Sequence, residues 1–215
     1  MPPYPVQEFN RADHVYRCAE LARMLADAIR FFNGTPVHSL PPPKPFKGAG
    51  VYALYCTAAS GLYAKYGREV NQLAYSVPVY IGKAVPKGWR QSRSVGDDGE
   101  GDSLAKRLRE HAKSIRLGSG LDIGDFSCRF VIFEGQAAHM IAAVEAALIA
   151  ETNPLWNSVV DGFGNHPPGK GREKGRMSQW DCLHPGRPWA RLLPPCDQTQ
   201  AEVRRRVTDY LAGLR

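Results

Sequence analysis

GVYALYC, residues 50–56, is rich in β-branched and aromatic side chains and predicts a strand. Two further stretches have the same character, VYIGK at residues 79–83 and FSCRFVIF at residues 126–133. Between these two, residues 103–117 carry apolar side chains at helical spacing, with Ser103 as the expected N-cap. The sequence therefore predicts that a helix separates the second strand from the third.

Three more helices are expected elsewhere in the chain. Residues 11–32 carry an apolar stripe, and the Gly-Thr-Pro sequence that follows stops the helix. Residues 137–151 form an almost wholly apolar helix that ends before Pro154, and residues 201–214 form an amphipathic one. Residues 162–176, rich in glycine, proline, lysine and arginine, predict a basic loop. This mixture of strands and helices indicates an α+β protein.

Each of the first two strands pairs a tyrosine with a glycine two positions away. Gly50 precedes Tyr52, and Gly82 follows Tyr80. Glycine weakens a strand unless another backbone or a ligand must come close. If the strands are neighbours, the two phenols can meet at one phosphate; because tyrosine is common in strands, simple core packing is the alternative.

The bulk composition favours a polyanionic partner. The chain has 215 residues, a net charge of +7 and a pI of about 9.3, and such basic proteins attract phosphate backbones. The sequence shows no membrane span and no signal peptide, so we expect a cytoplasmic protein. Its five cysteines lack the close spacing of a zinc site and are expected to be reduced.

Arg107 and His111 lie four residues apart, on one face of the predicted helix 103–117. Arginine can bind a phosphate in bidentate fashion, and histidine can relay a proton near neutral pH. A solvated basic face is the alternative, because several lysines and arginines share this helix.

Glu145 stands among apolar residues on nearly all sides of its helix. A buried carboxylate needs a partner, which is either an arginine or a divalent cation. One carboxylate together with water molecules is what magnesium accepts beside a phosphate. Asn157, beyond the end of that helix, is either a turn cap or part of the same site.

In this order the residues resemble the active site of the GIY-YIG endonuclease superfamily. The resemblance rests on Gly50-Val51-Tyr52, Tyr80-Ile81-Gly82, Arg107, His111, Glu145 and Asn157. The stretches 83–93 and 154–166 resemble one branch, the type II restriction endonucleases that act on CCGCGG.

The resemblance implies a core of a small three-stranded antiparallel sheet flanked by helices, at residues 48–160 of a single domain spanning 1–215. Residues 1–47 would add an N-terminal helix and a Pro-rich connector, and residues 161–215 a basic loop and a C-terminal helix. The chain departs from the family in two insertions, 57–77 and 84–101, where we expect part of the sequence recognition.

The resemblance also implies a role for each residue. Tyr52 would be the general base or would orient the attacking water, and His111 would accept its proton. Tyr80 would bind the water or the scissile phosphate, Arg107 would stabilise the transition state, and Asn157 would brace the site. Glu145 would hold one Mg²⁺ ion, and the products would carry 5′-phosphate and 3′-hydroxyl ends.

The substrate would be double-stranded DNA, and a palindromic site implies a homodimer. A cognate DNA methyltransferase would protect the host. The expected DNA-binding residues are Lys83, Lys87, Arg90, Arg93, Lys170, Arg172, Lys174 and Arg176. For Lys83 an ordinary surface lysine, and for the 170–176 loop a solvated loop, are the alternatives.

Two other functions fit part of the pattern. A structure-specific repair nuclease or a homing nuclease would share the site but usually carries a separate DNA-binding module, and none is visible in the sequence. A non-catalytic basic DNA-binding protein would be expected to have lost Arg107 or Glu145, and both are present.

Overall fold

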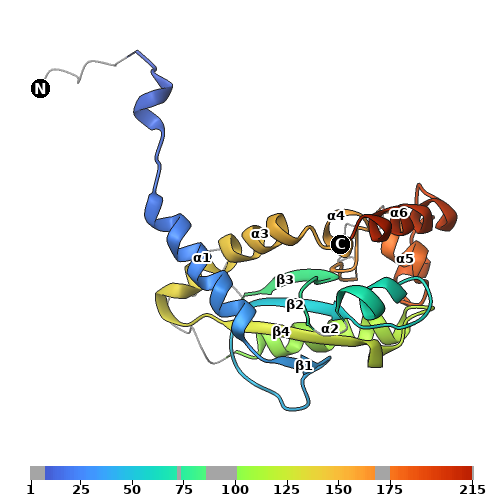
Figure 1. The fold of residues 1–215 in the computed structure, drawn as a ribbon. Coiled ribbons are helices and arrows are strands. Elements are labelled where there is room, and N and C mark those ends of the chain that lie inside the picture. Colours follow the sequence, from blue (N-terminus) through green and yellow to red (C-terminus); the bar gives the residue numbers. More distant parts are fainter. Residues whose placement is uncertain (1–7, 72–73, 86–100, 168–174, 215) are drawn as a thin grey trace, which may run out of the picture.

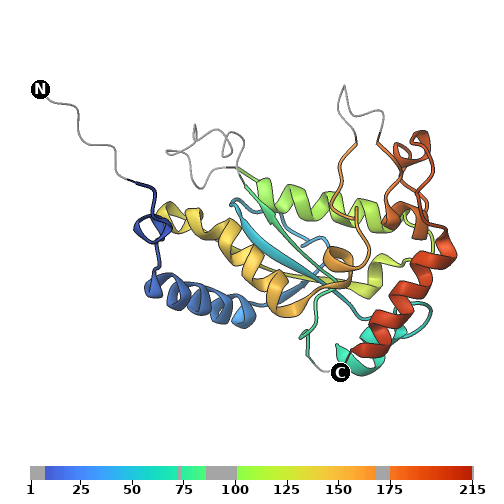
Figure 2. The same cartoon turned by 90° about the horizontal axis from the view of Figure 1, so that it is seen from above.

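The computed structural model describes residues 8–71, 74–85, 101–167 and 175–214. Within these ranges an antiparallel sheet lies between two sets of helices (Figures 1 and 2). The strands are β1 (Val37–Ser39), β2 (Gly50–Cys56), β3 (Tyr80–Ala84) and β4 (Phe126–Ile132). The longer helices are α1 (Ala19–Gly34), α2 (Ser103–Leu117), α3 (Ile141–Thr152) and α6 (Gln200–Gly213). The shorter ones are α4 (Leu155–Ser158) and α5 (Gln179–Leu183).

The sheet has the strand order β1-β4-β2-β3, with all neighbouring strands of the described residues antiparallel. Strand β2 occupies a central position, and all its residues are buried. The expected antiparallel sheet is confirmed, with a fourth strand, β1, beyond the three predicted. Strand β1 has only three residues, which is too short for a strand pattern in the sequence. It forms by pairing with the outer edge of β4.

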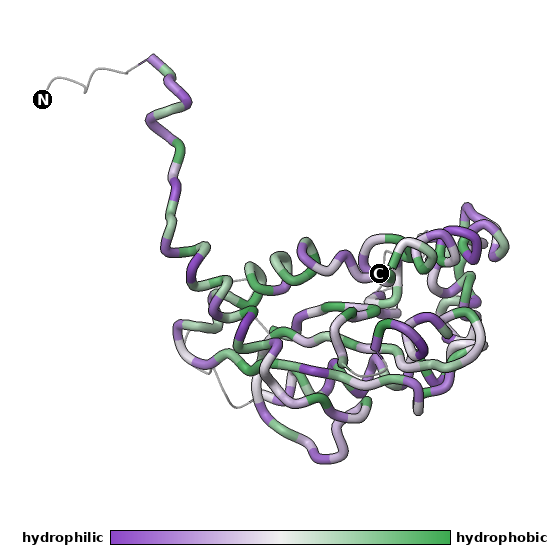
Figure 3. Tube along the Cα trace, viewed as in Figure 1, coloured by the Kyte–Doolittle hydropathy of each residue, from purple (hydrophilic) through white to green (hydrophobic). Residues whose placement is uncertain are grey.

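The two faces of the sheet bury alternate residues of β2, as the pleat of a strand requires. Tyr52, Leu54 and Cys56 face a core built with α2, α4, α5 and α6, whereas Val51, Ala53 and Tyr55 face α1 and α3. Figure 3 shows α3 as hydrophobic along most of its length, in keeping with its position against the sheet.

The first helix is shorter than predicted. Helix α1 begins at Ala19 instead of residue 11, and a separate 3-10 turn covers Arg11–His14. The Asn10 side chain caps this turn by accepting from the backbone N–H of Ala12, after which the chain is extended at Val15. This segment projects from the body of the molecule (Figure 1), so it lacks the packing that stabilises most helices.

The other predicted elements differ from the structure mainly at their ends. Helix α2 has the predicted bounds, but Asp102 occupies the N-cap position that was assigned to Ser103. The first turns of the predicted helix 137–151 are a 3-10 helix, Gly135–Met140, before α3 begins. The last helix is confirmed as α6, which starts with a capping box between Thr199 and Glu202.

The insertion at residues 57–77 is partly core. Tyr63 and Tyr66 are buried in the same cluster as Tyr52, and Tyr66 begins a short π-helix, Tyr66–Val70. All five cysteines are free thiols, and Cys56 and Cys128 are buried in the sheet as expected. Among the described residues, none of the helices has the length and apolar character needed to span a bilayer.

Candidate active site

The centre of the site is a hydrogen bond between Tyr52 on β2 and His111 on α2. The Tyr52 Oη lies 2.6 Å from the His111 Nε2, and both side chains are almost completely buried. Burial raises the pKa of the Tyr52 phenol well above its usual value and lowers the pKa of His111 well below its own. The phenol therefore keeps its proton near neutral pH, and the neutral imidazole can accept a hydrogen bond from it.

Tyr80 on β3 completes an aromatic cluster with this pair. Its ring centroid lies 5.2 Å from that of His111 and 6.3 Å from that of Tyr52. Gly82 makes room for the Tyr52 phenol, since a Cβ at Gly82 would lie 2.4 Å from the Tyr52 Oη. A Cβ at Gly50 would instead lie 1.9 Å from the backbone oxygen of Val131. Both glycines thus permit a close approach, in one case by a side chain and in the other by a backbone.

Arg107 lies one turn before His111 on α2, and the surrounding groups hold its guanidinium. Its Nη2 donates to the backbone oxygen of Gly164 at 2.7 Å, and its Nη1 donates to Glu110 at 3.2 Å. The Nη1 also lies 2.6 Å from the Nε2 of His166. Partial burial, followed by the charge of Arg107, lowers the pKa of His166, which favours the neutral, accepting imidazole.

Glu145 on α3 forms an ion pair with Lys83 on β3. The Glu145 side chain is 16% exposed, so it lies at the edge of the apolar layer and not on the open surface. The sequence predicts an arginine or a divalent cation as the partner of Glu145; in the structure the partner is a lysine. Lys83, expected either to touch phosphate or to be an ordinary surface lysine, is paired with Glu145 in the structure.

Glu145 lies near enough to the two tyrosines for its charge to act on them. After burial, which raises the pKa of both phenols, the charge of Glu145 contributes a further increase in the pKa of Tyr52 and of Tyr80. The described residues hold no group of three or more His, Cys, Asp or Glu side chains that would form a complete metal cage. A lone carboxylate such as that of Glu145 fits magnesium, which keeps most of its water ligands.

Asn157 fixes the strand that carries Tyr80. Its Oδ1 accepts from the backbone N–H of Ile81 at 2.8 Å, and its Nδ2 donates to the Ile81 oxygen at 2.9 Å. Ile81 lies between Tyr80 and Gly82, so the amide of Asn157 binds the middle of the YIG sequence. This contact bridges α4 and β3, and it differs from the turn cap considered as the alternative.

Most of the expected DNA-binding residues lie outside the described part of the chain. These are Lys87, Arg90, Arg93, Lys170, Arg172 and Lys174. Arg176 is described, and its exposed side chain lies 3.1 Å from Asp197 and donates to the oxygen of Pro195 at 3.3 Å.

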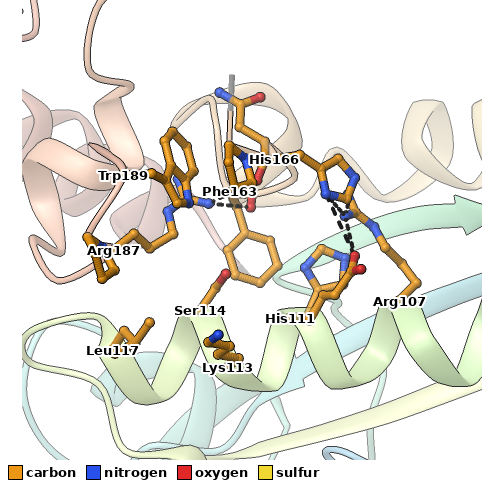
Figure 4. A pocket seen from close by; sticks show the side chains of 13 residues that line it. Arg107, His111, Lys113, Ser114, Leu117, Phe163, His166, Arg187 and Trp189 are labelled. Atoms are coloured by element: carbon orange, nitrogen blue, oxygen red, sulfur yellow. Dashed lines mark hydrogen bonds and ion pairs between the residues drawn. The ribbon is translucent and has the colours of Figure 1, made fainter. Parts of the chain in front are cut away.

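A cavity of about 400 Å³ opens beside Arg107 and His111, between α2 and the segments 163–167 and 187–189 (Figure 4). Phe163 lies in it, stacked on His111 with ring centroids 4.6 Å apart. Arg187 and His166 also line it. None of these three residues was singled out from the sequence, because each belongs to an irregular segment without a periodic pattern.

The sequence that builds this site matches one known protein family. The model of the Eco29kI GIY-YIG domain, a restriction endonuclease family, matches residues 44–211, which is most of the chain. A comparison with curated proteins finds no match. The match includes the strands with both tyrosines, the helix with Arg107 and His111, and the segments that carry Glu145 and Asn157. The chain therefore belongs to the Eco29kI GIY-YIG family of restriction endonucleases, and its substrate is DNA.

Proposed function

We propose that the protein is a type II restriction endonuclease that hydrolyses double-stranded DNA at a short GC-rich palindrome, CCGCGG. The cleavage would depend on Mg²⁺ and leave 5′-phosphate and 3′-hydroxyl ends. The observation that carries the proposal is the buried Tyr52–His111 hydrogen bond beside Arg107. The pair supplies a proton acceptor and Arg107 a cation that can bind phosphate, which are two of the parts that phosphodiester hydrolysis needs.

Tyr52 and His111 would act together as the base. A phenol with a raised pKa is a poor base alone, because it is already protonated. In the proposed step Tyr52 takes a proton from the attacking water while its own proton passes to the Nε2 of His111. The imidazolium that forms would leave its proton to solvent after cleavage, which restores the neutral pair.

Arg107 would bind the scissile phosphate and stabilise the charge that builds up on it. In the structure its donors are directed to Gly164, Glu110 and His166. A DNA phosphate would bind the remaining guanidinium N–H groups or replace one of these acceptors. The two side-chain acceptors, His166 and Glu110, are 61% and 39% exposed, so either can return to water.

Glu145 would hold the Mg²⁺ ion, which when bound polarises the phosphate and stabilises the leaving 3′ oxygen. Lys83 occupies the same carboxylate in the structure. The lysine thereby neutralises a partly buried charge until DNA and the ion arrive, and its ammonium is then free to contact a phosphate. Tyr80 would orient the water or the phosphate from the neighbouring strand β3.

The palindromic target implies that two copies act as a homodimer on the two DNA strands. The basic residues of the 84–101 insertion and of the 162–176 loop would contact the backbone, and a cognate methyltransferase would protect the host sites. Those parts of the proposal rest on charge and on the family resemblance.

Digestion of a sequenced plasmid by the purified protein with Mg²⁺ tests the proposal, with Glu145→Ala as the matched variant. Cuts at one short palindrome by the wild type alone, with mapped 5′-phosphate and 3′-hydroxyl ends, would support it. Cuts confined to branched DNA would instead indicate a structure-specific nuclease. DNA binding without cleavage by either protein would indicate a non-catalytic binding protein.

A further inference from the structure

Arg187 and Asp181 form an ion pair inside the C-terminal part of the chain. The Arg187 Nε and Nη2 each donate to a different oxygen of the Asp181 carboxylate at 2.6 Å, and the two side chains are only 2% and 1% exposed. The guanidinium also lies 4.6 Å from the ring centroids of Trp180 and Trp189. These contacts leave the arginine a single orientation.

The remaining donors of Arg187 bind the backbone of the segment 162–165. Its Nη2 donates to the oxygen of Gly162 at 2.9 Å, and its Nη1 to those of Phe163 at 3.1 Å and Asn165 at 3.3 Å. The one carbonyl in this segment that Arg187 does not bind, that of Gly164, accepts from Arg107. Two arginines thus bind four consecutive backbone oxygens between them.

Besides binding Arg107 through the Gly164 oxygen, the segment 162–165 contacts two further groups of the active site. The Phe163 ring stacks on His111 at an interplanar angle of 17°, and its edge-to-face contact with Tyr80 has a centroid distance of 4.9 Å. The backbone at Gly164 is so close to Tyr80 that a Cβ there would lie 2.5 Å from the Tyr80 Oη. Figure 4 shows Phe163 between Arg187 and His111.

We infer that Arg187, fixed by Asp181, is a positioning residue for the nuclease site, which it places through the segment 162–165. The inference rests on the proposed function, because it assigns Arg187 to the same site. Arg187 would set the position of the Gly164 oxygen, and hence of Arg107, and would keep Phe163 against His111.

The chemistry of the Arg187–Asp181 ion pair indicates that it does more than stabilise the fold. Burying an ion pair costs solvation energy, and apolar residues of similar volume often serve stability equally well. A planar guanidinium, however, can bind one carboxylate and several carbonyls at fixed angles, which neither an apolar side chain nor a lysine can do. The pair therefore fixes the geometry of the segment.

Arg187→Lys is the decisive variant, because it keeps the positive charge beside Asp181 and removes the fork of donors. We expect its single-turnover cleavage rate at saturating DNA to fall roughly 100-fold, as small displacements of catalytic groups do. The dissociation constant for DNA should change little. Val207→Ala, in the same core but on α6, is the control for lost stability, and it should cleave at the wild-type rate.

A second readout needs neither DNA nor metal. The NMR titration of the His111 imidazole should show a higher pKa in Arg187→Lys than in the wild type, because a looser Phe163 admits water. Arg187→Lys changes none of the other groups that face His111, and position 187 keeps its positive charge. Those other groups are Tyr52, Tyr80, Arg107, Glu110 and His166. In Val207→Ala the titration should match the wild type.

Phe163→Leu tests the same link if Arg187→Lys does not fold. It leaves the ion pair intact and removes the ring from His111, so it too should raise the His111 pKa and slow cleavage. Wild-type cleavage rates and an unchanged His111 titration in whichever of these variants folds would overturn the inference. If the wild type cleaves no DNA, the proposed function fails, while the titration still decides whether Arg187 positions His111.

Discussion

The ammonium of Lys83 on the outer strand β3 forms an ion pair with the carboxylate of Glu145 on helix α3. Lys83 is 37% exposed and Glu145 is 16% exposed, so the pair lies where the apolar layer meets solvent. A carboxylate among the alanines, valine and isoleucines of α3 needs such a counter-charge. The lysine and a metal ion would compete for the same oxygens.

Glu145→Gln should abolish most cleavage and leave the fold intact, because glutamine has nearly the same shape and carries no charge. We expect a loss of roughly 1,000-fold or more in the single-turnover rate, since a bound metal contributes several kcal/mol to such reactions. Cleavage at the wild-type rate would exclude Glu145 as the metal ligand.

In Lys83→Met the Mg²⁺ concentration for half-maximal cleavage should fall, because the competing cation is gone.

Tyr52→Phe should separate catalysis from packing. The ring stays in the core, but the buried Nε2 of His111 loses its hydrogen-bond partner, which costs about 1–3 kcal/mol of folding free energy. Cleavage should fall roughly 100- to 10,000-fold, the range for a lost general base. Tyr55→Phe, on the opposite face of the same strand, is the control and should cleave normally. Equal rates for the two variants would contradict the role of Tyr52.

Gly82→Ala should disable the site through a single methyl group. The added Cβ would lie 2.4 Å from the Tyr52 Oη, so the phenol must move away from His111. Gly34→Ala at the end of α1 has no atom within 4 Å of its added Cβ and serves as the control. We expect loss of cleavage only in Gly82→Ala, with a shift in tyrosine absorbance that reports the displaced phenol. Unchanged activity there would show that the phenol tolerates displacement.

Stability should fall in acid because His184 is held neutral in the folded protein. Burial lowers its pKa to about 4, while the unfolded chain keeps a value of about 6.5. The unfolded state therefore binds more protons than the folded state below about pH 6.5. The free energy of unfolding falls as the pH is lowered towards 4. At about 1.4 kcal/mol per pH unit, the loss reaches roughly 3 kcal/mol. The lowered pKa of His111 acts in the same direction.

Urea denaturation at several pH values between 7 and 4 measures this loss. His184→Gln should show a shallower dependence on pH, because it keeps a side chain able to bond Tyr63 and the Ser119 oxygen without a titrating ring. His14→Gln, in the exposed N-terminal turn, should behave as the wild type. Parallel curves for His184→Gln and the wild type would contradict the assignment to His184.

The regular elements could be predicted because their residues carry strong local patterns. The β-branched and aromatic content of residues 50–56 and the helical spacing of residues 103–117 predict elements that have those same bounds in the structure. Tyr52, Tyr80, Arg107 and His111 could be grouped because two neighbouring strands and one helix face bring them together. Their catalytic roles remain proposals.

Other features arise only from tertiary contacts. Strand β1 forms because β4 has a free edge for it, and the partner of Glu145 comes from a strand far away in sequence. Arg187 lies in an irregular stretch, and only the folded chain brings its guanidinium to the carbonyls of the segment 162–165. Sequence patterns reveal local periodicity, and contacts between residues far apart in the sequence leave no periodic pattern.

The outer position of β3 gives the Asn157 contact a second consequence. An edge strand with free backbone groups invites pairing with another chain, which leads to aggregation. The backbone N–H and oxygen of Ile81 are taken by Asn157, and the oxygen of Val79 accepts from the backbone N–H of Trp156. Helix α4 therefore blocks strand addition along the first part of this edge, from Val79 to Ile81, and the contact that fixes the tyrosine strand also hinders self-association through β3.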